Sequence, residues 1–402
     1  LFPDHETLPY DPFSPHPDII AARLRTLSEL AALERGIVLC PVDSLMQRLP
    51  PADYILARAF EMKSGDRLDL HSFRERLSHA GYEPAEQVYQ AGQFAVRGSV
   101  IDLFPAGADE RYSIDLFDDE IDSIRSFDAD SQRSTGAVDR IALLPAREYP
   151  CDEAGLEAFR RAFRDRFDVD TRKVPLYQDL RAGLHPQGLE QYLPLFYAET
   201  SSLLDYLPRP PIAVLQEDVH DAARTLDRRT RERWEQRRHD VERPILDPGE
   251  LFFSPVEIRT ALDALPTTHL AGSADTASGS GAFASEPPPD LRIHERGKEP
   301  AAALQAWLEG FEGRVLFAAD TAGRREVLRT TLNSFGVRPS GHELFRTFMD
   351  SGDTLGLAVL PVDEGFVCPD ASGRPLAVIT ESQLFGGRSR PRTERATGER
   401  DP

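Results

Sequence analysis

The chain has few cysteines and no long apolar run, and each shortage excludes a class of protein. Its three cysteines, Cys40, Cys151 and Cys368, are far apart and form no CxxC pair. This spacing argues against a disulfide framework and a structural zinc site, and it fits a reducing cytoplasm. The longest apolar runs, such as GIVLCPV, are far too short to cross a bilayer, so we expect no membrane partner. The chain opens with Leu1 and no signal peptide, so we expect a cytoplasmic fragment whose beginning has been cut.

The motifs that usually carry catalysis are missing as well. A P-loop needs a lysine that reaches phosphates, and only three lysines occur; Lys298 follows Gly297 but precedes Glu299 instead of Ser or Thr. HELFR at 342–346 has Arg346 where a zinc protease needs its second histidine. No GxSxG elbow is present. We therefore expect no enzymatic activity, cofactor or metal in this chain.

Three other patterns each have a plain and a functional interpretation. The strand–turn–helix pattern RVLFAADTAGRRE could hold a phosphate at the start of its helix, although a single glycine favours an ordinary turn. The acids at 118–120 could bind a metal, but solvated turn residues explain them better. The arginine-rich helix at 224–243 is either a solvated helix with i,i+4 ion pairs or a nucleic-acid-binding face. The formal net charge of −20 disfavours nucleic acid overall without excluding a local basic patch.

The length of 402 residues allows two to four domains with cores of their own. Periodicity and composition change several times along the chain. The predicted divisions are 1–58, the C-terminal part of a truncated α/β domain; 59–147, a small α+β module; 148–275, largely helical; 276–290, a flexible linker; 291–386, a second α/β unit; and 387–402, a linker tail.

The first division contains three predicted elements. A helical stripe of Ile20, Leu24, Leu27 and Leu30 indicates a helix that Asp18 could cap. The apolar run RGIVLCPV then predicts a short buried strand. VDSLMQRL predicts a helix that ends at the two prolines that follow it.

The stretch GQFAVRGSVIDLFPAG at 92–107 predicts a strand that shows an arginine to solvent. Val96 and Val100 are the expected inward pair, so Arg97 points outward. In the next predicted strand, YSIDLF, alternation buries the isoleucine and leucine and leaves Phe117 on the polar face.

This pair has plain explanations and a functional one. A neighbouring domain could cover Phe117, and Arg97 could form a local ion pair with Asp102, Asp115 or Glu120. An exposed aromatic residue beside an arginine is also the usual composition of an interface hot spot.

Long motifs around these residues resemble a known family. AVRGSVIDLFP, followed by FDDEIDSIRSFDADSQR, resembles the domain shared by the bacterial transcription-repair coupling factor family and UvrB. GLEQYLPLFYAETSSLLDYLP at 188–208 resembles a second segment common to both. ETLPYDPFSPHPDIIAARLRTL, PVDSLMQRLPP and the extra α/β domain favour the coupling factor family. The resemblance implies an α/β fold: a multidomain UvrB-like module, domains 1A, 2 and 1B, followed by a small α/β domain, domain 3.

The same resemblance implies a function and its partners. It indicates an N-terminal, non-catalytic scaffold that recruits UvrA to RNA polymerase stalled at DNA damage. In the family, the contacts to RNA polymerase and double-stranded DNA, and the ATP- and magnesium-dependent translocase motor, belong to domains absent here. A C-terminal domain of the family masks the UvrA surface by an intramolecular contact. The alternative is a fragment of a UvrB-type damage-binding ATPase.

Three UvrA-binding residues follow from the resemblance. Arg97 matches the arginine of the RGxxxDxFP motif, and Phe117 matches the aromatic residue before the acidic turn. A second arginine of many members falls at Ser113. Arg111, two residues away and hence on the same strand face, is the expected substitute.

Overall fold

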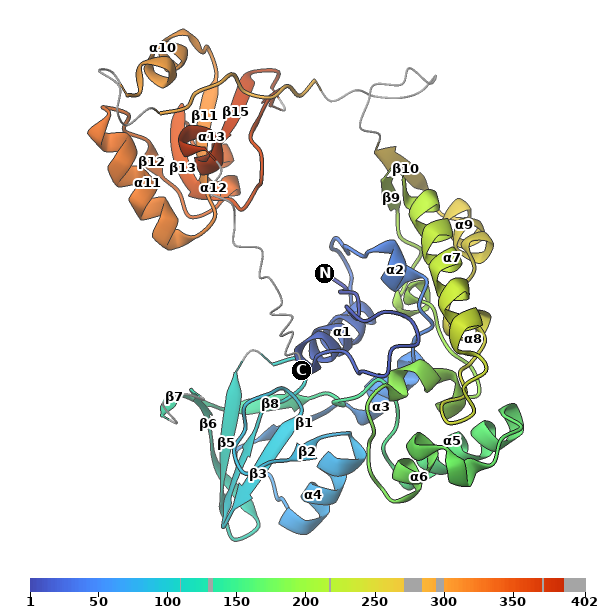
Figure 1. Cartoon of the computed structure of the whole chain (residues 1–402). Helices are drawn as coiled ribbons and strands as arrows, with labels where there is room; N and C mark the ends of the chain where they lie inside the picture. The colour runs from blue at the N-terminus through green and yellow to red at the C-terminus, as the bar shows by residue number, and fades with distance from the viewer. Residues whose placement is uncertain are drawn as a thin grey trace, which may run out of the picture. The chain divides into compact units, whose positions relative to one another are not determined.

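The computed structural model describes residues 1–108, 110–128, 133–216, 218–270, 284–293, 300–370 and 372–386. The chain divides into two compact units, unit 1 (Leu1–Ser273) and unit 2 (Ala274–Pro402) (Figure 1). Within the described ranges, no helix combines the length and the apolar composition that a membrane span requires. The predicted tail, 387–402, and most of the predicted linker lie outside the described residues.

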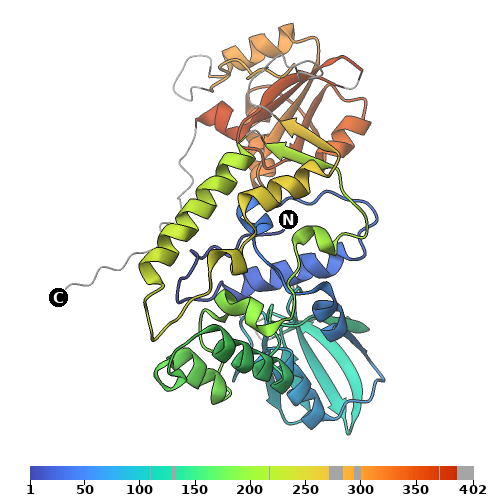
Figure 2. The ribbon, with the colours of Figure 1, turned by 90° about the vertical axis from the view of Figure 1, so that its right-hand side faces the viewer.

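Segments 1–58 and 148–270 of unit 1 share hydrophobic cores although they are far apart in the sequence. Phe2 and Leu24 pack in one buried cluster with Leu203 and Tyr206. Figure 2 shows the long helix α7 beside α9 in this part of the molecule. The helical elements are α1 (Pro17–Leu30), α2 (Val42–Leu45), α3 (Ala52–Arg58), α5 (Glu153–Arg166), η1 (Thr171–Lys173), α6 (Pro175–Arg181), η2 (Leu189–Phe196), η3 (Leu203–Tyr206), α7 (Val219–Arg237), α8 (Pro248–Leu251) and α9 (Pro255–Asp263). Strands β9 (Ala213–Gln216) and β10 (Thr267–Leu270) pair in parallel.

The predicted stripe of α1 is confirmed, because all four of its apolar residues are buried. The predicted cap is wrong. His16 is the N-cap, and its Nδ1 accepts the backbone N–H of Asp18 at 3.3 Å. Pro17 occupies the first helical position, for which its fixed φ is suited, and this starts the helix before Asp18.

Two other predictions for this segment are wrong, and both failures depend on long-range pairing. Residues 36–40 form no strand, and Ile37 and Leu39 are exposed. Among the described residues, their backbone is tied by one backbone hydrogen bond, from Phe2 N–H to Leu39 O at 2.9 Å, and a strand needs a full ladder. The helix predicted for VDSLMQRL ends after one turn at Leu45, because residues 47 and 49 bridge to Phe252 and Ser201.

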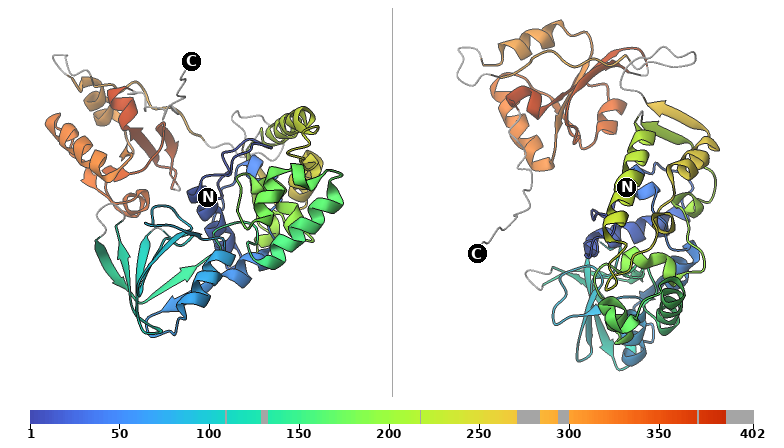
Figure 3. Two further views of the ribbon diagram at one scale, coloured as in Figure 1. Left: turned by 60° about the horizontal axis from the view of Figure 1, so that its bottom comes forward. Right: turned by 45° about the vertical axis from the view of Figure 1, so that its right-hand side comes forward.

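Residues 60–143 of unit 1 form a module of sheet and helix. Helix α4 (Leu70–His79) begins at Asp69, whose carboxylate accepts the Ser72 N–H at 2.8 Å, and it is followed by Gly81 at φ +86°, as predicted. The helix lies against one face of the sheet, where Phe73 and Leu77 pack in the main core of the module (Figure 3). Strands β1 (Phe60–Lys63) and β8 (Arg140–Leu143) form a separate antiparallel pair. The main sheet has six strands in the order β2 (Glu83–Pro84), β3 (Gln93–Arg97), β4 (Val100–Leu103), β5 (Arg111–Phe117), β6 (Glu120–Phe127) and β7 (Ser134–Val138).

A buried ion pair lies where this module leads into segment 148–270. Arg23 of α1 is fully buried, and its Nε donates to Glu148 Oε1 at 2.7 Å. His5 Nε2 lies 3.2 Å from the other carboxylate oxygen. Burial alone would raise the pKa of the Glu148 carboxyl, but Arg23 and His5 outweigh it and hold that pKa at about 2. Through these two contacts, Glu148 ties segment 1–58 to the start of segment 148–270.

Unit 2 is an α/β domain, as predicted, with a five-stranded sheet in the order β12-β13-β11-β15-β14. The central strand β11 is buried at every residue, which explains its unbroken apolar run. Alternate residues of β11 enter two cores: Phe317 meets Leu328 of α11 on one face, and Leu316 meets Phe348 of α12 on the other. The elements are α10 (Ala302–Gly310), β11 (Arg314–Ala319), α11 (Ala322–Ser334), β12 (Ser340–Gly341), α12 (Phe345–Asp350), β13 (Leu355–Val359), β14 (Phe366–Pro369), β15 (Pro375–Thr380) and α13 (Glu381–Phe385).

Candidate protein-binding face

The sheet face opposite α4, here called the outer face, carries the residues that the sequence singled out. Its members on the central strands include Arg97, Val100, Asp102, Arg111, Ser113, Asp115, Phe117, Ser123 and Arg125. The hairpins β3–β4 and β5–β6 run side by side, and the Leu116 N–H donates to Ser99 O at 2.9 Å. Their two turns therefore lie at the same end of the sheet.

The turn of the β3–β4 hairpin decides which residues share a face with Arg97. Gly98 and Ser99 form a two-residue loop in which Gly98 has φ +62°, a conformation that glycine adopts without strain. Arg97 pairs directly with Val100, so both point to the outer face. The prediction that Val96 and Val100 form an inward pair is thus wrong for Val100, because a two-residue turn brings it opposite Arg97. Val96 does pack against the inner core.

Phe117 lies at the tip of the β5–β6 hairpin, and its side chain is exposed. Ile114 and Leu116 are buried, as the alternation predicts, while Phe117 is 74% exposed. Asp118 follows in the left-handed region at φ +54°. The neighbouring loop fixes the tip, since the Leu68 N–H donates to Asp119 O at 2.6 Å. A large apolar ring is therefore held out at a braced turn.

Arg97 is held by a carboxylate that lies deeper in the same face. Its Nη2 donates to Asp102 Oδ2, and the Ser113 hydroxyl donates to the other carboxylate oxygen at 2.7 Å. The Asp102 side chain is only 7% exposed, whereas that of Arg97 is 57% exposed. The expected local ion pair is thus present, and it leaves more than half of the Arg97 side chain accessible.

A second ion pair mirrors the first across the sheet. Arg125 of β6 pairs opposite Ser113 of β5, and its Nη2 donates to Asp115. The Ser123 hydroxyl donates to the same oxygen of Asp115 at 3.3 Å. The Arg125 side chain is 46% exposed. Sequence reasoning missed this residue, because only the register between β5 and β6 places it beside Ser113.

Arg111, the expected substitute for the arginine missing at Ser113, is on the outer face but is engaged elsewhere. Its Nη2 donates to Tyr89 O at 2.8 Å, and its guanidinium lies 4.5 Å from the centre of the Phe104 ring. Phe104 packs on a small apolar cluster that includes Val88 and Phe127. Arg111 therefore covers this cluster, at the end of β5 away from Phe117.

The outer face is equipped to bind another protein. An exposed aromatic ring can be buried on docking, and guanidinium groups held by a neighbouring carboxylate can form forked hydrogen bonds with acceptors of a partner. Within the described residues, no group of three or more His, Cys, Asp or Glu side chains is placed to hold a metal ion. The acids at 118–120 form the tip and first strand residue of the hairpin.

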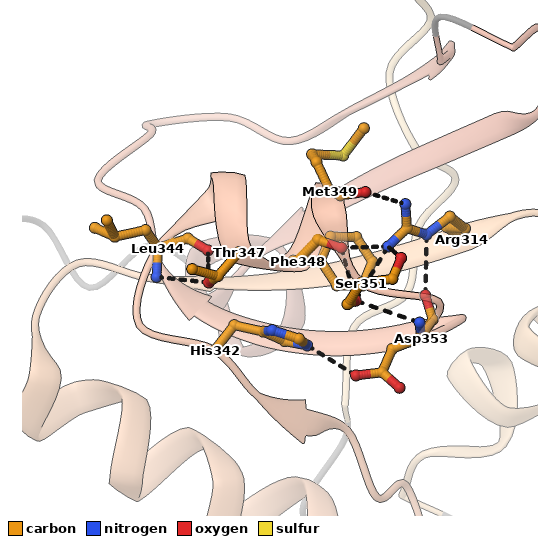
Figure 4. A network of polar contacts seen from close by, with 8 residues as sticks. All are labelled: Arg314, His342, Leu344, Thr347, Phe348, Met349, Ser351 and Asp353. Atoms are coloured by element: carbon orange, nitrogen blue, oxygen red, sulfur yellow. Dashed lines mark hydrogen bonds and ion pairs between the residues drawn. The ribbon is translucent and has the colours of Figure 1, made fainter.

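The HELFR motif belongs to a polar network of unit 2 (Figure 4). His342 precedes helix α12 and its Nε2 lies 3.0 Å from Asp353 Oδ2, so the motif does not span one helical face. Arg314, the buried first residue of β11, donates to the carbonyls of Phe348, Met349, Ser351 and Asp353. These bonds satisfy the carboxyl end of α12, so the network stabilises the fold.

The other two patterns have structural roles. In RVLFAADTAGRRE, Thr321 caps α11 by accepting the Arg324 N–H at 3.3 Å. Helix α7 carries the predicted ion pairs, including Arg231 with Asp227 at 3.0 Å. Arg233 of the same helix instead holds the N-terminal segment, with its Nε donating to Pro9 O at 2.6 Å.

Comparison with known proteins agrees with this arrangement. Residues 60–149 match the UvrB interaction domain, and residues 307–384 match the MFD, D3 domain. The chain is 38% identical over 98% of its length to the transcription-repair-coupling factor of Haemophilus influenzae, and 39% identical over 96% to that of Escherichia coli. It is 31% identical over 54% of its length to the factor of Bacillus subtilis.

The matched domain and the exposed face together define a UvrB-like interaction module that is followed by a small α/β domain. Over nearly its whole length the chain is similar to transcription-repair-coupling factors, and it spans about a third of the length of the Haemophilus and Escherichia relatives. All three relatives named above are coupling factors, so the UvrB-type ATPase alternative is not favoured.

Proposed function

We propose that this chain is a non-catalytic scaffold that binds UvrA through the outer face of its UvrB interaction domain. Within a longer protein, it brings UvrA to RNA polymerase stalled at DNA damage, while other domains act on DNA as an ATP-dependent translocase. The observation that carries the proposal is the exposed Phe117 ring on a braced hairpin tip, beside the fixed and accessible Arg97. The chain itself needs no ATP, magnesium or other cofactor for this role.

The physical basis is a hot spot of one ring and one cation. Burying the Phe117 ring removes apolar surface from water, and Arg97 adds charge-assisted hydrogen bonds with its direction already set by Asp102. Loss of either group should cost about 1–3 kcal/mol of binding free energy if each is a hot spot. UvrA is thus expected to offer an apolar pocket next to an acidic acceptor.

The test is a titration of purified UvrA with the wild-type chain and with Arg97→Ala. We expect at least tenfold weaker binding by the variant, with an unchanged circular dichroism spectrum. Arg140→Ala, which removes an exposed arginine of β8 in the same module, is the matched control and should bind like wild type. Equal affinity for wild type and Arg97→Ala would rule the proposal out.

The proposal extends to regulation by a C-terminal domain of the longer protein. If that domain covers the outer face, this chain should bind UvrA more tightly than the longer protein does. Titrating both proteins with UvrA tests this directly. Equal dissociation constants would contradict masking, but they would not contradict the proposed UvrA site.

A further inference from the structure

Four neighbouring strands each place one charged residue on the outer face, in two adjacent cross-strand rows. Arg97 of β3 is followed by Asp102 of β4, Asp115 of β5 and Arg125 of β6. The two acids are on the middle strands, and each accepts a hydrogen bond from the arginine of the strand next to it. Both acids are also bound by a serine hydroxyl of an adjacent strand. The face thus shows two arginines that are fixed in the same way, on either side of two partly buried carboxylates.

Arg125 fits the role of a second cationic contact better than Arg111 does. Arg125 pairs opposite Ser113, so it lies in the middle of the face and reaches toward Asp115, which is two residues from Phe117. Arg111 is four residues further from the tip than Asp115 is, and its guanidinium is already used by Tyr89 O and by the Phe104 ring. Of Arg111 and Arg125, Arg125 is therefore the one that keeps an accessible guanidinium in the middle of the outer face.

We propose that Arg125, in place of Arg111, is the second cationic contact of the outer face with UvrA, and that Asp115 is its positioning residue. This inference rests on the proposed function and adds to it a specific partner chemistry. UvrA should present two acceptor sites, one for each arginine, separated by the width of the two middle strands. A carboxylate is the natural acceptor, because an arginine side chain binds it through two parallel N–H groups.

The competing reading is that the Arg125–Asp115 pair is only a surface ion pair. Such pairs contribute little to stability, so removing Arg125 should then change neither folding nor binding. The two readings differ in the effect on UvrA affinity.

The experiment compares Arg125→Ala with Arg111→Ala in UvrA titrations of the whole chain. Both variants remove one positive charge from the outer face, so long-range electrostatics affects them alike. We expect Arg125→Ala to weaken binding about five- to thirtyfold, within the range of interface hot spots, and Arg111→Ala to weaken it less than threefold. Circular dichroism and thermal unfolding of each variant check the fold.

The role of Asp115 is tested by a double-mutant cycle. Asp115→Asn should weaken UvrA binding about two- to tenfold, because a freed arginine must be immobilised on docking. In the Arg125→Ala background the same change should have almost no effect. Asp122→Asn, which removes an exposed acid of the same strand pair at its bulge, is the charge-matched control and should leave affinity unchanged.

The outcomes separate this inference from the proposed function. If Arg97→Ala loses binding but Arg125→Ala binds like wild type, the second contact is wrong while UvrA recruitment stands. If Arg111→Ala loses as much affinity as Arg125→Ala, the assignment of Arg125 in place of Arg111 is wrong. Equal effects of Asp115→Asn with and without Arg125 would show that Asp115 does not act through that arginine. If wild type itself does not bind UvrA, the proposed function fails and this inference fails with it.

Discussion

The outer face of the UvrB interaction domain and the Arg314 network of unit 2 use arginine in opposite ways. Arg314 is buried and directs its guanidinium onto backbone carbonyls at the end of α12, so its hydrogen bonds are used within the fold. Arg97 and Arg125 each bind one aspartate and keep about half of their side chains accessible. The comparison teaches that exposure, rather than the presence of an ion pair, separates an arginine available to a partner from one that stabilises the fold.

The Arg23–Glu148 pair belongs with the buried kind, and breaking it should give the largest effect. Glu148→Gln leaves Arg23 buried without a full counter-charge, so we expect a loss of about 3–5 kcal/mol in the free energy of unfolding of unit 1. Urea unfolding followed by Trp234 fluorescence, with Trp307→Phe to silence unit 2, measures it. Arg228→Gln, on the exposed face of α7, is the control. A stable Glu148→Gln variant would show that the buried pair is not required.

The same pair predicts how unit 1 responds to acid. The folded pKa of Glu148, about 2, is below its unfolded value of about 4.5, so the stabilisation is fully present above pH 5 and is lost as the pH falls toward 2. The shift corresponds to about 3 kcal/mol. Urea unfolding at a series of pH values should show this slope for wild type. The slope should be reduced in Glu148→Gln, and an identical slope in both proteins would assign the acid sensitivity to other groups.

Arg314→Met should destabilise unit 2 by about 2–3 kcal/mol, because it removes several charge-assisted hydrogen bonds and leaves the carbonyls of α12 without a donor. Trp307 fluorescence, in a Trp234→Phe background, follows the unfolding of unit 2. Arg346→Met, which removes an exposed arginine of α12, should have little effect. UvrA binding by Arg314→Met should be unchanged. A loss of binding would contradict the distinction between buried arginines that stabilise the fold and exposed arginines that bind a partner.

Local patterns predicted much of this fold, and most of the failures have one physical cause, which is pairing between strands. Period-two alternation predicted the exposure of Phe117, and helical periodicity predicted the buried stripe of α1. The strand expected at 36–40 failed because strands depend on pairing partners, which a local pattern does not contain. Val100 was assigned to the wrong face because the parity of a hairpin depends on the length of its turn.

The candidate site likewise contains residues that a local pattern predicts and residues that depend on pairing between strands. Arg97 and Phe117 could be found from the sequence, since each breaks an otherwise regular pattern. The depth of Asp102, the engagement of Arg111 and the presence of Arg125 depend on the register of β4, β5 and β6, which no single strand specifies. Their roles in UvrA binding stay predictions.

The most direct test of the central claim is the affinity of UvrA for Phe117→Ala, compared with Phe13→Ala. Both changes remove an exposed phenyl ring from unit 1, but only Phe117 is on the outer face. We expect Phe117→Ala to lose at least tenfold in affinity while it keeps the wild-type circular dichroism spectrum, and Phe13→Ala to bind like wild type. Full-strength binding by a folded Phe117→Ala would contradict the outer face as the UvrA site.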